Sequence, residues 1–202
     1  LTLLVGIEEG QRRYKLNGKA KSIADLKGIL PAVVFTPDDL ALTKGASGVK
    51  RDAVDDLGSQ LTKNYYIVQR EYDQVNQYKN RFLKEDVSFD LVQSINDTLI
   101  TCATQLTFYR LELLSRIVVE LGNCYRRISG CEELEMKYYP SWSANEVDLS
   151  ARTDRDCIKT ALAAALEDRY LEERARKRSV VGPHADQMRF FINGRDVSLY
   201  AS

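Results

Sequence analysis

The sequence predicts an α+β protein in which β structure at both ends flanks a long antiparallel helical arm. Asn-Gly dipeptides at Asn17-Gly18 and Asn193-Gly194 adjoin short alternating segments near the two ends. This dipeptide tolerates the positive φ angles of a two-residue hairpin turn. Between the two ends, residues 50–130 keep apolar side chains at spacings of three and four, the pattern of amphipathic helices.

The first 49 residues are expected to be mainly β structure. Residues 3–5 and residues 12–16 are predicted to be strands, the second running into Asn17-Gly18. Residues 25–30 are expected to form a helical turn before Pro31. The apolar run Ala32-Val33-Val34-Phe35 then predicts a buried strand that ends at Thr36-Pro37, because the residue before a proline avoids the helical region.

The arm is predicted to be two helices joined by a turn at residues 84–87. The first stripe comprises Leu57, Leu61, Tyr65, Val68, Tyr72, Val75 and Phe82, and the second comprises Phe89, Val92, Ile95, Leu99, Cys102, Leu106, Tyr109, Leu113, Ile117 and Leu121. The second helix is expected to end near Gly130, a common C-terminal stop. A helix of about 40 residues is about 60 Å long, so two helices joined by a short turn must pack antiparallel.

Residues 131–202 are expected to return to mixed structure. Leu134, Met136 and Tyr138 alternate with charged residues, which predicts a strand with one wet face. Thr153 with Asp156 indicates a capping box that opens a helix.

This predicted helix ends in a basic run at residues 174–178, which suits the negative end of the helix dipole. Residues 179–181 predict a short apolar strand leading into Gly182-Pro183-His184, and a second strand precedes Asn193-Gly194.

Composition excludes several classes of function. The 202 residues carry a formal net charge of zero, one histidine and four scattered cysteines. We therefore expect reduced, buried thiols in a cytoplasmic protein and no metal site. The sequence has neither a phosphate-binding GxxxxGK[ST] loop nor a GxGxxG motif, so no catalytic residue is assigned. No apolar run approaches the ~20 residues of a membrane span, and no signal peptide is visible.

Two blocks carry a resemblance to a known family. The first is Val33-Val34-Phe35-Thr36-Pro37-Asp38-Asp39-Leu40, followed by Lys44-Gly45, Lys50-Arg51 and Asp55. The second runs from Gly182-Pro183-His184 through Asn193-Gly194 to Ala201-Ser202. The two blocks, with the separation that they have in this sequence, resemble RecF, a bacterial family of recombination and repair ATPases related to ABC and SMC proteins. The resemblance extends over nearly the whole chain. Ala185-Asp186-Gln187-Met188 departs from the family's basic-Asp-Asp-Leu.

The resemblance implies that the chain is the middle region of a longer ATPase, and the missing initial Met fits this. Residues 1–49 and 131–202 would form part of the ATPase head, and residues 50–130 the arm, or domain II. The intact protein would bind ATP and magnesium, and this region alone would bind neither. Asp38 or Asp39 would lie in the loop that senses the nucleotide, with His184 nearby, and Ser202 would contact the γ-phosphate bound by a second subunit. ATP would then hold a homodimer together.

The resemblance also implies a role in DNA repair, replication, recombination and the SOS response. Lys44, Lys50 and Arg51 would contact DNA phosphates at the base of the arm, without reading sequence. Single- and double-stranded DNA, a RecR-like mediator and the RecA pathway would be the partners, with no membrane. Hydrolysis of ATP would be slow and dependent on DNA.

Other interpretations of the same residues stay open. The two aspartates could cap the next turn, His184 could be structural, and the basic residues could be solvated surface charge. The run at 174–178 is better explained as a helix end than as a binding site. At the level of the whole chain, the alternatives are the head of another SMC-like ATPase and a non-enzymatic helical interaction module. The aromatic content of the arm favours a compact arm over a thin coiled coil.

Overall fold

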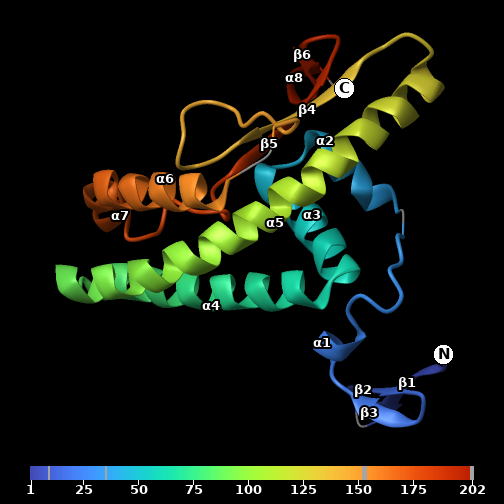
Figure 1. The fold of residues 1–202 in the computed structure, drawn as a ribbon, viewed down its shortest axis with the longest axis horizontal. Helices are drawn as coiled ribbons and strands as arrows, with labels where there is room; N and C mark the ends of the chain where they lie inside the picture. The colour runs from blue at the N-terminus through green and yellow to red at the C-terminus, as the bar shows by residue number, and fades with distance from the viewer. Residues whose placement is uncertain (9, 35, 152–153, 201–202) are drawn as a thin grey trace.

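The computed structural model describes residues 1–8, 10–34, 36–151 and 154–200. The chain begins with three strands and a short helix: β1 (Leu3–Glu8), β2 (Gln11–Leu16), β3 (Lys19–Lys21) and α1 (Ile23–Leu26). A 3-10 turn and four helices follow: η1 (Pro37–Leu40), α2 (Ala41–Lys44), α3 (Ser47–Leu61), α4 (Lys63–Glu85) and α5 (Phe89–Ser129). The remainder comprises β4 (Leu134–Tyr139), α6 (Arg155–Asp168), α7 (Tyr170–Arg176), β5 (Gln187–Ile192), β6 (Arg195–Asp196) and α8 (Val197–Tyr200). The fold is thus the predicted mixture of helices and antiparallel sheet (Figure 1).

The predicted helical arm is the longest feature of the structure. Helices α4 and α5 run antiparallel and meet at a tight turn, where Asp86 takes the left-handed conformation with φ of 52° (Figure 1). Helix α5 has 41 residues and ends at Gly130, with φ of 82°, as the sequence predicted. At the other end of α4, the Thr62 side chain accepts a hydrogen bond from the Tyr65 amide at 3.2 Å. This cap separates α4 from α3.

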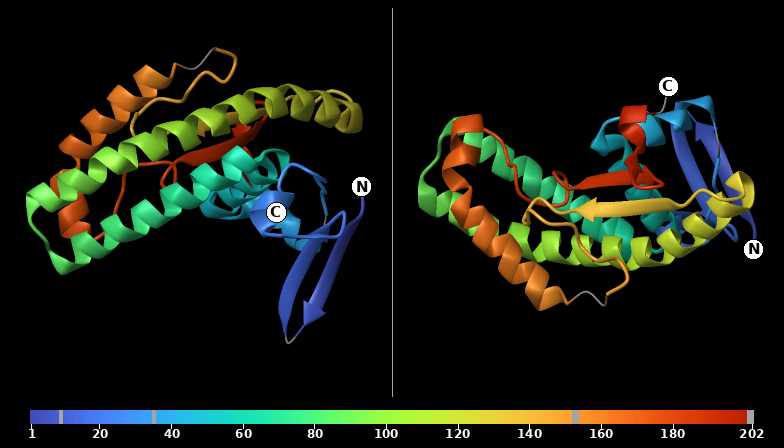
Figure 2. Two further views of the ribbon diagram at one scale, coloured as in Figure 1. Left: turned by 60° about the horizontal axis from the view of Figure 1, so that its bottom comes forward. Right: turned by 90° about the horizontal axis from the view of Figure 1, so that it is seen from above.

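The two ends of the chain form two separate three-stranded antiparallel sheets, β1-β2-β3 and β4-β5-β6. Both predicted hairpin turns are confirmed. Asn17 and Gly18 have φ of 49° and 82°, and Asn193 and Gly194 have φ of 48° and 75°. The first sheet projects away from the rest of the molecule, whereas the second lies along the arm (Figure 2).

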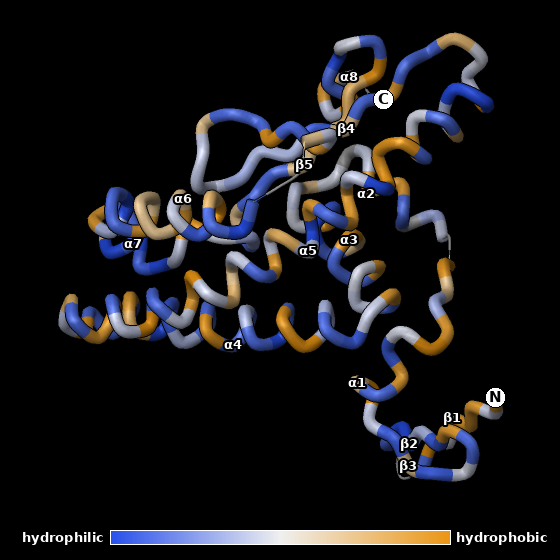
Figure 3. The backbone as a smooth tube through the Cα atoms, in the orientation of Figure 1, coloured by the Kyte–Doolittle hydropathy of each residue, from blue (hydrophilic) through white to orange (hydrophobic). Residues whose placement is uncertain are grey.

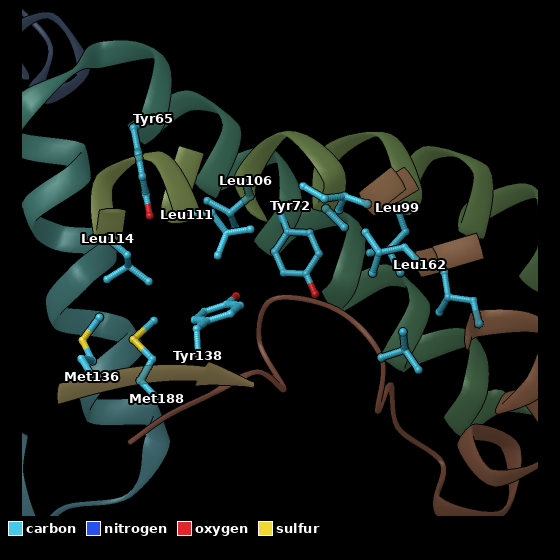
Figure 4. Close-up of a cluster of buried hydrophobic side chains, with 14 residues drawn as sticks. Tyr65, Tyr72, Leu99, Leu106, Leu111, Leu114, Met136, Tyr138, Leu162 and Met188 are labelled. Atoms are coloured by element: carbon cyan, nitrogen blue, oxygen red, sulfur yellow. The ribbon is translucent and has the colours of Figure 1, made fainter. Parts of the chain in front are cut away.

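The hydrophobic core lies between the arm helices, α6 and the second sheet (Figure 4). Helix α6 packs on α5 through its buried face, and strand β4 also packs on α5. The predicted wet-and-dry alternation of β4 is confirmed, because Met136 and Tyr138 are buried while Glu135 is exposed. Two predicted stripes therefore meet one sheet in a single core, whose most buried large side chains are Tyr72, Leu99, Leu106, Leu111, Leu114, Tyr138, Ile158, Leu162 and Met188.

The predicted strand at residues 32–35 is wrong for the part that the structure describes. Ala32, Val33 and Val34 form no strand, and the two valines are 85% and 76% exposed. The segment forms part of the apolar stretch between α1 and α2 (Figure 3). The described ladders offer it no neighbouring strand, and the Ala32 amide donates instead to Gln60 Oε1 at 2.9 Å. Phe35 lies outside the described residues.

The predicted strand at residues 179–181 is also wrong. These residues form a loop whose amides are bound by side chains instead of by a neighbouring strand. The Ser179 amide donates to Asn80 Oδ1 at 2.7 Å, and the Val180 amide donates to Glu173 Oε1 at 2.8 Å. Fixed side-chain acceptors thus satisfy the backbone without a sheet.

The other predictions in the C-terminal region need smaller corrections. Thr153 lies outside the described residues, and Asp154 caps α6 by accepting from the Asp156 amide at 3.0 Å. The predicted single helix is divided at Arg169 into α6 and α7. The expectation of buried thiols is wrong for Cys124, Cys131 and Cys157, which are exposed, and Cys102 is only partly buried. None of the helices in the described residues is long and apolar enough to cross a bilayer.

Candidate functional site

Arg110, on α5, is the centre of a buried polar network at the base of the arm. It is only 1% exposed. Its Nε and Nη2 donate to the two carboxylate oxygens of Asp55, on α3, at 3.0 and 2.7 Å. Its Nη1 donates to the Pro183 carbonyl at 2.8 Å and to the Tyr138 hydroxyl at 3.3 Å. One guanidinium therefore ties α3, α5, β4 and the segment before β5 together in the two-pronged geometry that suits arginine.

Asp186 is the second buried charge of this network. Its carboxylate accepts from the Tyr138 hydroxyl and, at 2.7 Å, from the Ser141 amide. Arg110 Nη1 lies 3.7 Å from the same carboxylate, and Arg51 donates to the Asp186 carbonyl at 2.6 Å. Burial raises the pKa of Asp186, while the charge of Arg110 and the bonds from Tyr138 and Ser141 act in the opposite direction.

His184 is held on both of its ring nitrogens. Nε2 lies 3.2 Å from the Ser179 carbonyl, which can only accept, so Nε2 carries the proton and Nδ1 accepts from the Tyr72 hydroxyl. Figure 4 shows the Tyr72 hydroxyl pointing toward the loop before β5. Burial lowers the pKa of His184 below its ordinary value. The ring is therefore a neutral tie between α4 and the loop at neutral pH.

The segment of residues 179–186, which we name the GPH loop, is fixed by a second buried pair as well. Lys79 on α4 and Glu173 on α7 are both fully buried, with Nζ and Oε2 2.6 Å apart. The other oxygen of Glu173 accepts from the Val180 amide at 2.8 Å and from the Ser179 hydroxyl at 3.1 Å. A buried ion pair with extra hydrogen bonds holds one geometry well, because breaking either side leaves a charge without a partner.

The loop also approaches α4 too closely for a side chain at Gly182. Its φ is 133°, and a Cβ at this position would collide with the Tyr72 hydroxyl. The Gly182 amide donates to Ser141 Oγ at 2.8 Å, and Ser141 Oγ donates to the Gly182 carbonyl at 3.0 Å. The Gly-Pro-His sequence is thus a loop that closes onto the arm.

Two of the residues predicted to bind nucleotide lie in the turn before α2. Asp38 and Asp39 lie in η1, directly before α2, and α2 contacts α8, the helix that leads to residue 201. Asp39 Oδ2 accepts from the Thr36 amide at 2.5 Å and from the Thr36 hydroxyl at 3.1 Å, so it caps its own turn. Ser202 lies outside the described residues. His184 belongs instead to the GPH loop, so the structure does not place it in the turn formed by η1.

The residues predicted to contact DNA lie on α2 and α3. Lys50 is 6% exposed, its Nζ lies 5.6 Å from the centre of the Phe190 ring, and burial lowers its pKa. Arg51 braces the GPH loop through the Asp186 carbonyl. Lys44 ends α2. The side chains of Lys50 and Arg51 therefore have structural contacts, and the binding of DNA by all three residues stays a prediction.

Sequence reasoning missed the buried charges of Lys79 and Arg110, although the spacing of their neighbours signals them. Tyr65, Tyr72 and Lys79 follow one another at seven-residue intervals, and all three are buried. Leu106 and Leu114 stand four residues to either side of Arg110. A charged residue on the apolar face of a helix is expected to have a buried partner. This signal identifies Lys79 and Arg110, but it cannot identify their partners.

The fold and the buried network define a class of α+β protein whose helical arm and C-terminal sheet share one core. The solved structures that share this fold include two of the recombination mediator protein RecF in the RecFOR pathway. The structure named RecF-ATPrS has a TM-score of 0.88 at 24% identity and covers 99% of this chain and 54% of its own. The structure named RecF-ATP has a TM-score of 0.84 at 25% identity, covering 96% of this chain and 52% of its own.

Sequence comparison gives the same family. The chain is 31% identical to the DNA replication and repair protein RecF of Heliobacterium modesticaldum, over 99% of this chain and 54% of the relative. It is also 31% identical to the RecF of Symbiobacterium thermophilum, over 100% of this chain and 53% of the relative. No family model matches the chain. The chain belongs to the RecF family of DNA replication and repair proteins, and it spans about half the length of these curated relatives.

Proposed function

We propose that this chain forms part of a DNA repair ATPase of the RecF type, which binds ATP with magnesium and dimerises around the nucleotide. The observation that carries the proposal is the likeness to the RecF-ATP structure along 96% of this chain. The position of η1 supports it further, because the helix after this turn contacts the helix that leads to Ala201 and Ser202. An aspartate in the turn would face magnesium and the attacking water, and Ser202 would face the partner's γ-phosphate.

The residues of this chain fit such a site only as supporting parts. Asp39 Oδ2 already caps the turn, and both nitrogens of His184 are bound within the protein. Neither feature cradles a triphosphate, which needs several backbone amides or basic side chains. We therefore assign the phosphate cradle to residues outside this chain. We propose that the intact protein is a slow, DNA-dependent ATPase.

The proposed division of the chain follows the sequence. Residues 1–49 and 131–202 would belong to the ATPase head, and residues 50–130 to the helical arm, or domain II. The structure supports an arm made of α3, α4 and α5. We further propose that the protein works in the cytoplasm on junctions of single-stranded and duplex DNA. It would act there with a RecR-like mediator and help to load RecA, with roles in recombination and the SOS response.

Dimerisation tests the nucleotide part of the proposal. The full-length product of the encoding gene is examined by analytical ultracentrifugation with ATP, with ADP and without nucleotide. We expect a dimer with ATP alone, because hydrogen bonds to a charged γ-phosphate are strong. S202R should abolish this dimer, and S94R, the same change on an exposed position of α5, should not. Equal dimerisation in all three nucleotide states would contradict the proposal.

The DNA contacts are tested by the salt dependence of binding to a tailed duplex. Removing charge with K44Q and R51Q should weaken binding uniformly across sequences. It should lower the slope of log K against log salt by roughly one for each phosphate that is no longer bound. The matched control is K19Q with K21Q, on the exposed strand β3. Lys50 is changed separately, because its side chain is buried. An unchanged slope would show that Lys44 and Arg51 do not contact DNA phosphates.

A further inference from the structure

A cleft of about 770 Å³ lies beside the GPH loop. One wall is the segment that follows β4, including Ser141 and Ser143. The other wall is formed by the end of α7, the GPH loop and the start of β5. The cleft is thus built from segments that the buried network already holds in place.

Among the residues that the structure describes, four guanidinium groups line this cleft, and no carboxylate does. They belong to Arg169, Arg176, Arg178 and Arg189. The chain as a whole has no net charge, so positive charge is concentrated here. Glu172, which does not line the cleft, pairs with Arg169 at 2.8 Å and with Arg176 at 3.0 Å. Its one carboxylate cannot neutralise four arginines, and the cleft keeps an excess of positive charge.

Two of the four arginines keep their charge available. Within the described part of the chain, Arg178 and Arg189 form no ion pair. Both are exposed. Helix α7 is capped at Lys177, which has a φ of 52°. Arg178 follows this cap, so it does not serve as the basic residue of the helix's last turn. Arg189 lies over the Tyr139 ring at 5.1 Å and donates to the Gln187 side chain at 2.9 Å.

The walls of the cleft are joined, so its shape is set in advance. Arg169 Nη1 lies 3.4 Å from the Ser141 carbonyl and 3.5 Å from the Val180 carbonyl, one on each wall. Beneath it, Ser141 and Gly182 exchange two hydrogen bonds. Asn80, on α4, anchors the Ser179 amide. A rigid group of arginines loses little conformational entropy when it binds an anion.

We propose that this arginine cleft binds phosphate groups, and that a DNA strand supplies them. Guanidinium groups match phosphate oxygens in pairs. The hydroxyls of Ser141 and Ser179 already donate within the protein, and that of Ser143, which accepts from the Asn145 amide, is a further donor in the lining. The aromatic ring in the lining, that of Tyr139, is already covered by Arg189, so the cleft is suited to the backbone of a strand and not to stacked bases. The choice of DNA rests on the proposed function, whereas the phosphate chemistry rests on the cleft alone.

The test compares two pairs of substitutions in the full-length product of the encoding gene. R178Q/R189Q removes two charges from the cleft. R126Q/R127Q removes two exposed charges from the end of α5, which lies on the opposite side of the molecule from α7 in Figure 1, and neither residue lines the cleft. Binding of a fluorescent tailed duplex is measured between about 50 and 200 mM salt, as is binding of inorganic pyrophosphate. Circular dichroism checks that each variant is folded.

We expect R178Q/R189Q to lower the salt slope for DNA by about two, at ~0.9 for each phosphate that is no longer neutralised, and R126Q/R127Q to leave it unchanged. If DNA binds and both pairs change the slope equally, or neither does, the cleft proposal is overturned and the proposed function stands.

If the unmodified protein binds no DNA, the DNA part of the proposed function fails, and DNA is excluded as the source of the phosphates. Pyrophosphate then tests the cleft by itself. Binding that R178Q/R189Q abolishes supports a site for a small phosphate ligand. Binding that is absent, or equal in the variant, overturns the site.

Discussion

Arg110 on α5 and Asp55 on α3 form a two-pronged ion pair, with nitrogen-to-oxygen distances of 3.0 and 2.7 Å, in the interior of the protein. The Tyr65 hydroxyl adds a third hydrogen bond to Asp55 at 2.6 Å. Arg110 also donates to the Tyr138 hydroxyl and to the Pro183 carbonyl. The pair therefore connects the start of the arm to the GPH loop, and several measurable consequences depend on it.

Removing one partner of this pair should destabilise the protein strongly. We expect D55N and R110M each to lower the free energy of unfolding by about 3–5 kcal/mol, because each leaves a buried charge without its partner. Urea denaturation followed by circular dichroism measures the change. The control is D25N, which breaks the exposed pair of Asp25 with Lys63 and should change stability little. If D55N and D25N lost comparable free energies of unfolding, burial of the Asp55–Arg110 pair would not add to its contribution to stability.

The second buried pair should respond unequally to loss of its two partners. Glu173 accepts from Ser179 and from the Val180 amide besides pairing with Lys79. K79M leaves these donors satisfied, whereas E173L leaves them unpaired next to a buried ammonium. We therefore expect E173L to be the more destabilising change, by about 1–3 kcal/mol for the donors left unpaired. Equal urea midpoints for the two variants would contradict this account.

Gly182 should tolerate no side chain while Tyr72 keeps its hydroxyl. G182A places a Cβ against that hydroxyl at a φ of 133°, whereas G130A has a positive φ of 82° and open space. Both variants carry an unfavourable backbone, which costs about 1 kcal/mol or more, and only G182A adds a collision. G182A should thus unfold at lower temperature than G130A, and Y72F should restore part of the loss. A double variant no more stable than G182A would exclude the collision as the cause.

His184 should make stability depend on pH. Burial lowers the pKa of His184, and the positive charges of Lys79 and Arg51 lower it further. The hydrogen bond to the Ser179 carbonyl and the negative charge of Asp186 act in the opposite direction. The unfolded chain takes up a proton near pH ~6.5, and the folded chain does so only at lower pH. The contribution of His184 is therefore complete above about pH 6.5 and is lost as the pH falls toward the folded pKa, by at most about 1.4 kcal/mol per pH unit.

Urea titrations at about pH 7.5, 6.5 and 5.5, which bracket the ordinary pKa of histidine, check this dependence. The chain has one histidine, so H184Q isolates its effect from that of buried carboxylates such as Asp186. We expect the midpoint of the unmodified protein to fall across this range more steeply than that of H184Q. Parallel midpoints would assign the dependence to other groups.

The sequence was sufficient to predict the parts of the fold that depend on local pattern. The stripes of α4 and α5 follow helical periodicity, and both Asn-Gly turns need positive φ angles that few residues tolerate. The predictions of strands were wrong for residues 32–34 and 179–181, because an apolar composition does not specify a partner strand. For residues 179–181 the partners are side chains of Glu173 and Asn80, which lie outside any local window.

The candidate site was predictable only in outline. The motif residues Asp55 and His184 were singled out, but their partners Arg110 and Tyr72 were not, because pairing across 55 and 112 residues has no local signature. The arginine cleft shows the same limit. Its residues come from several parts of the chain, and only residues 176 and 178 stood out as a basic run. Folding, and not composition, brings them together.

The order in which the network's members occur along the chain has a consequence for biosynthesis. Asp55 and Arg110 both leave the ribosome well before Pro183 and Asp186, and α3 and α5 can pair them while the C-terminal part is still being made. The GPH loop then packs onto α3 and α5, which have already formed and paired. We therefore expect the amides of the loop to become protected from hydrogen exchange later in synthesis than those of α3 and α5, although several of its side chains are among the most deeply buried in the molecule.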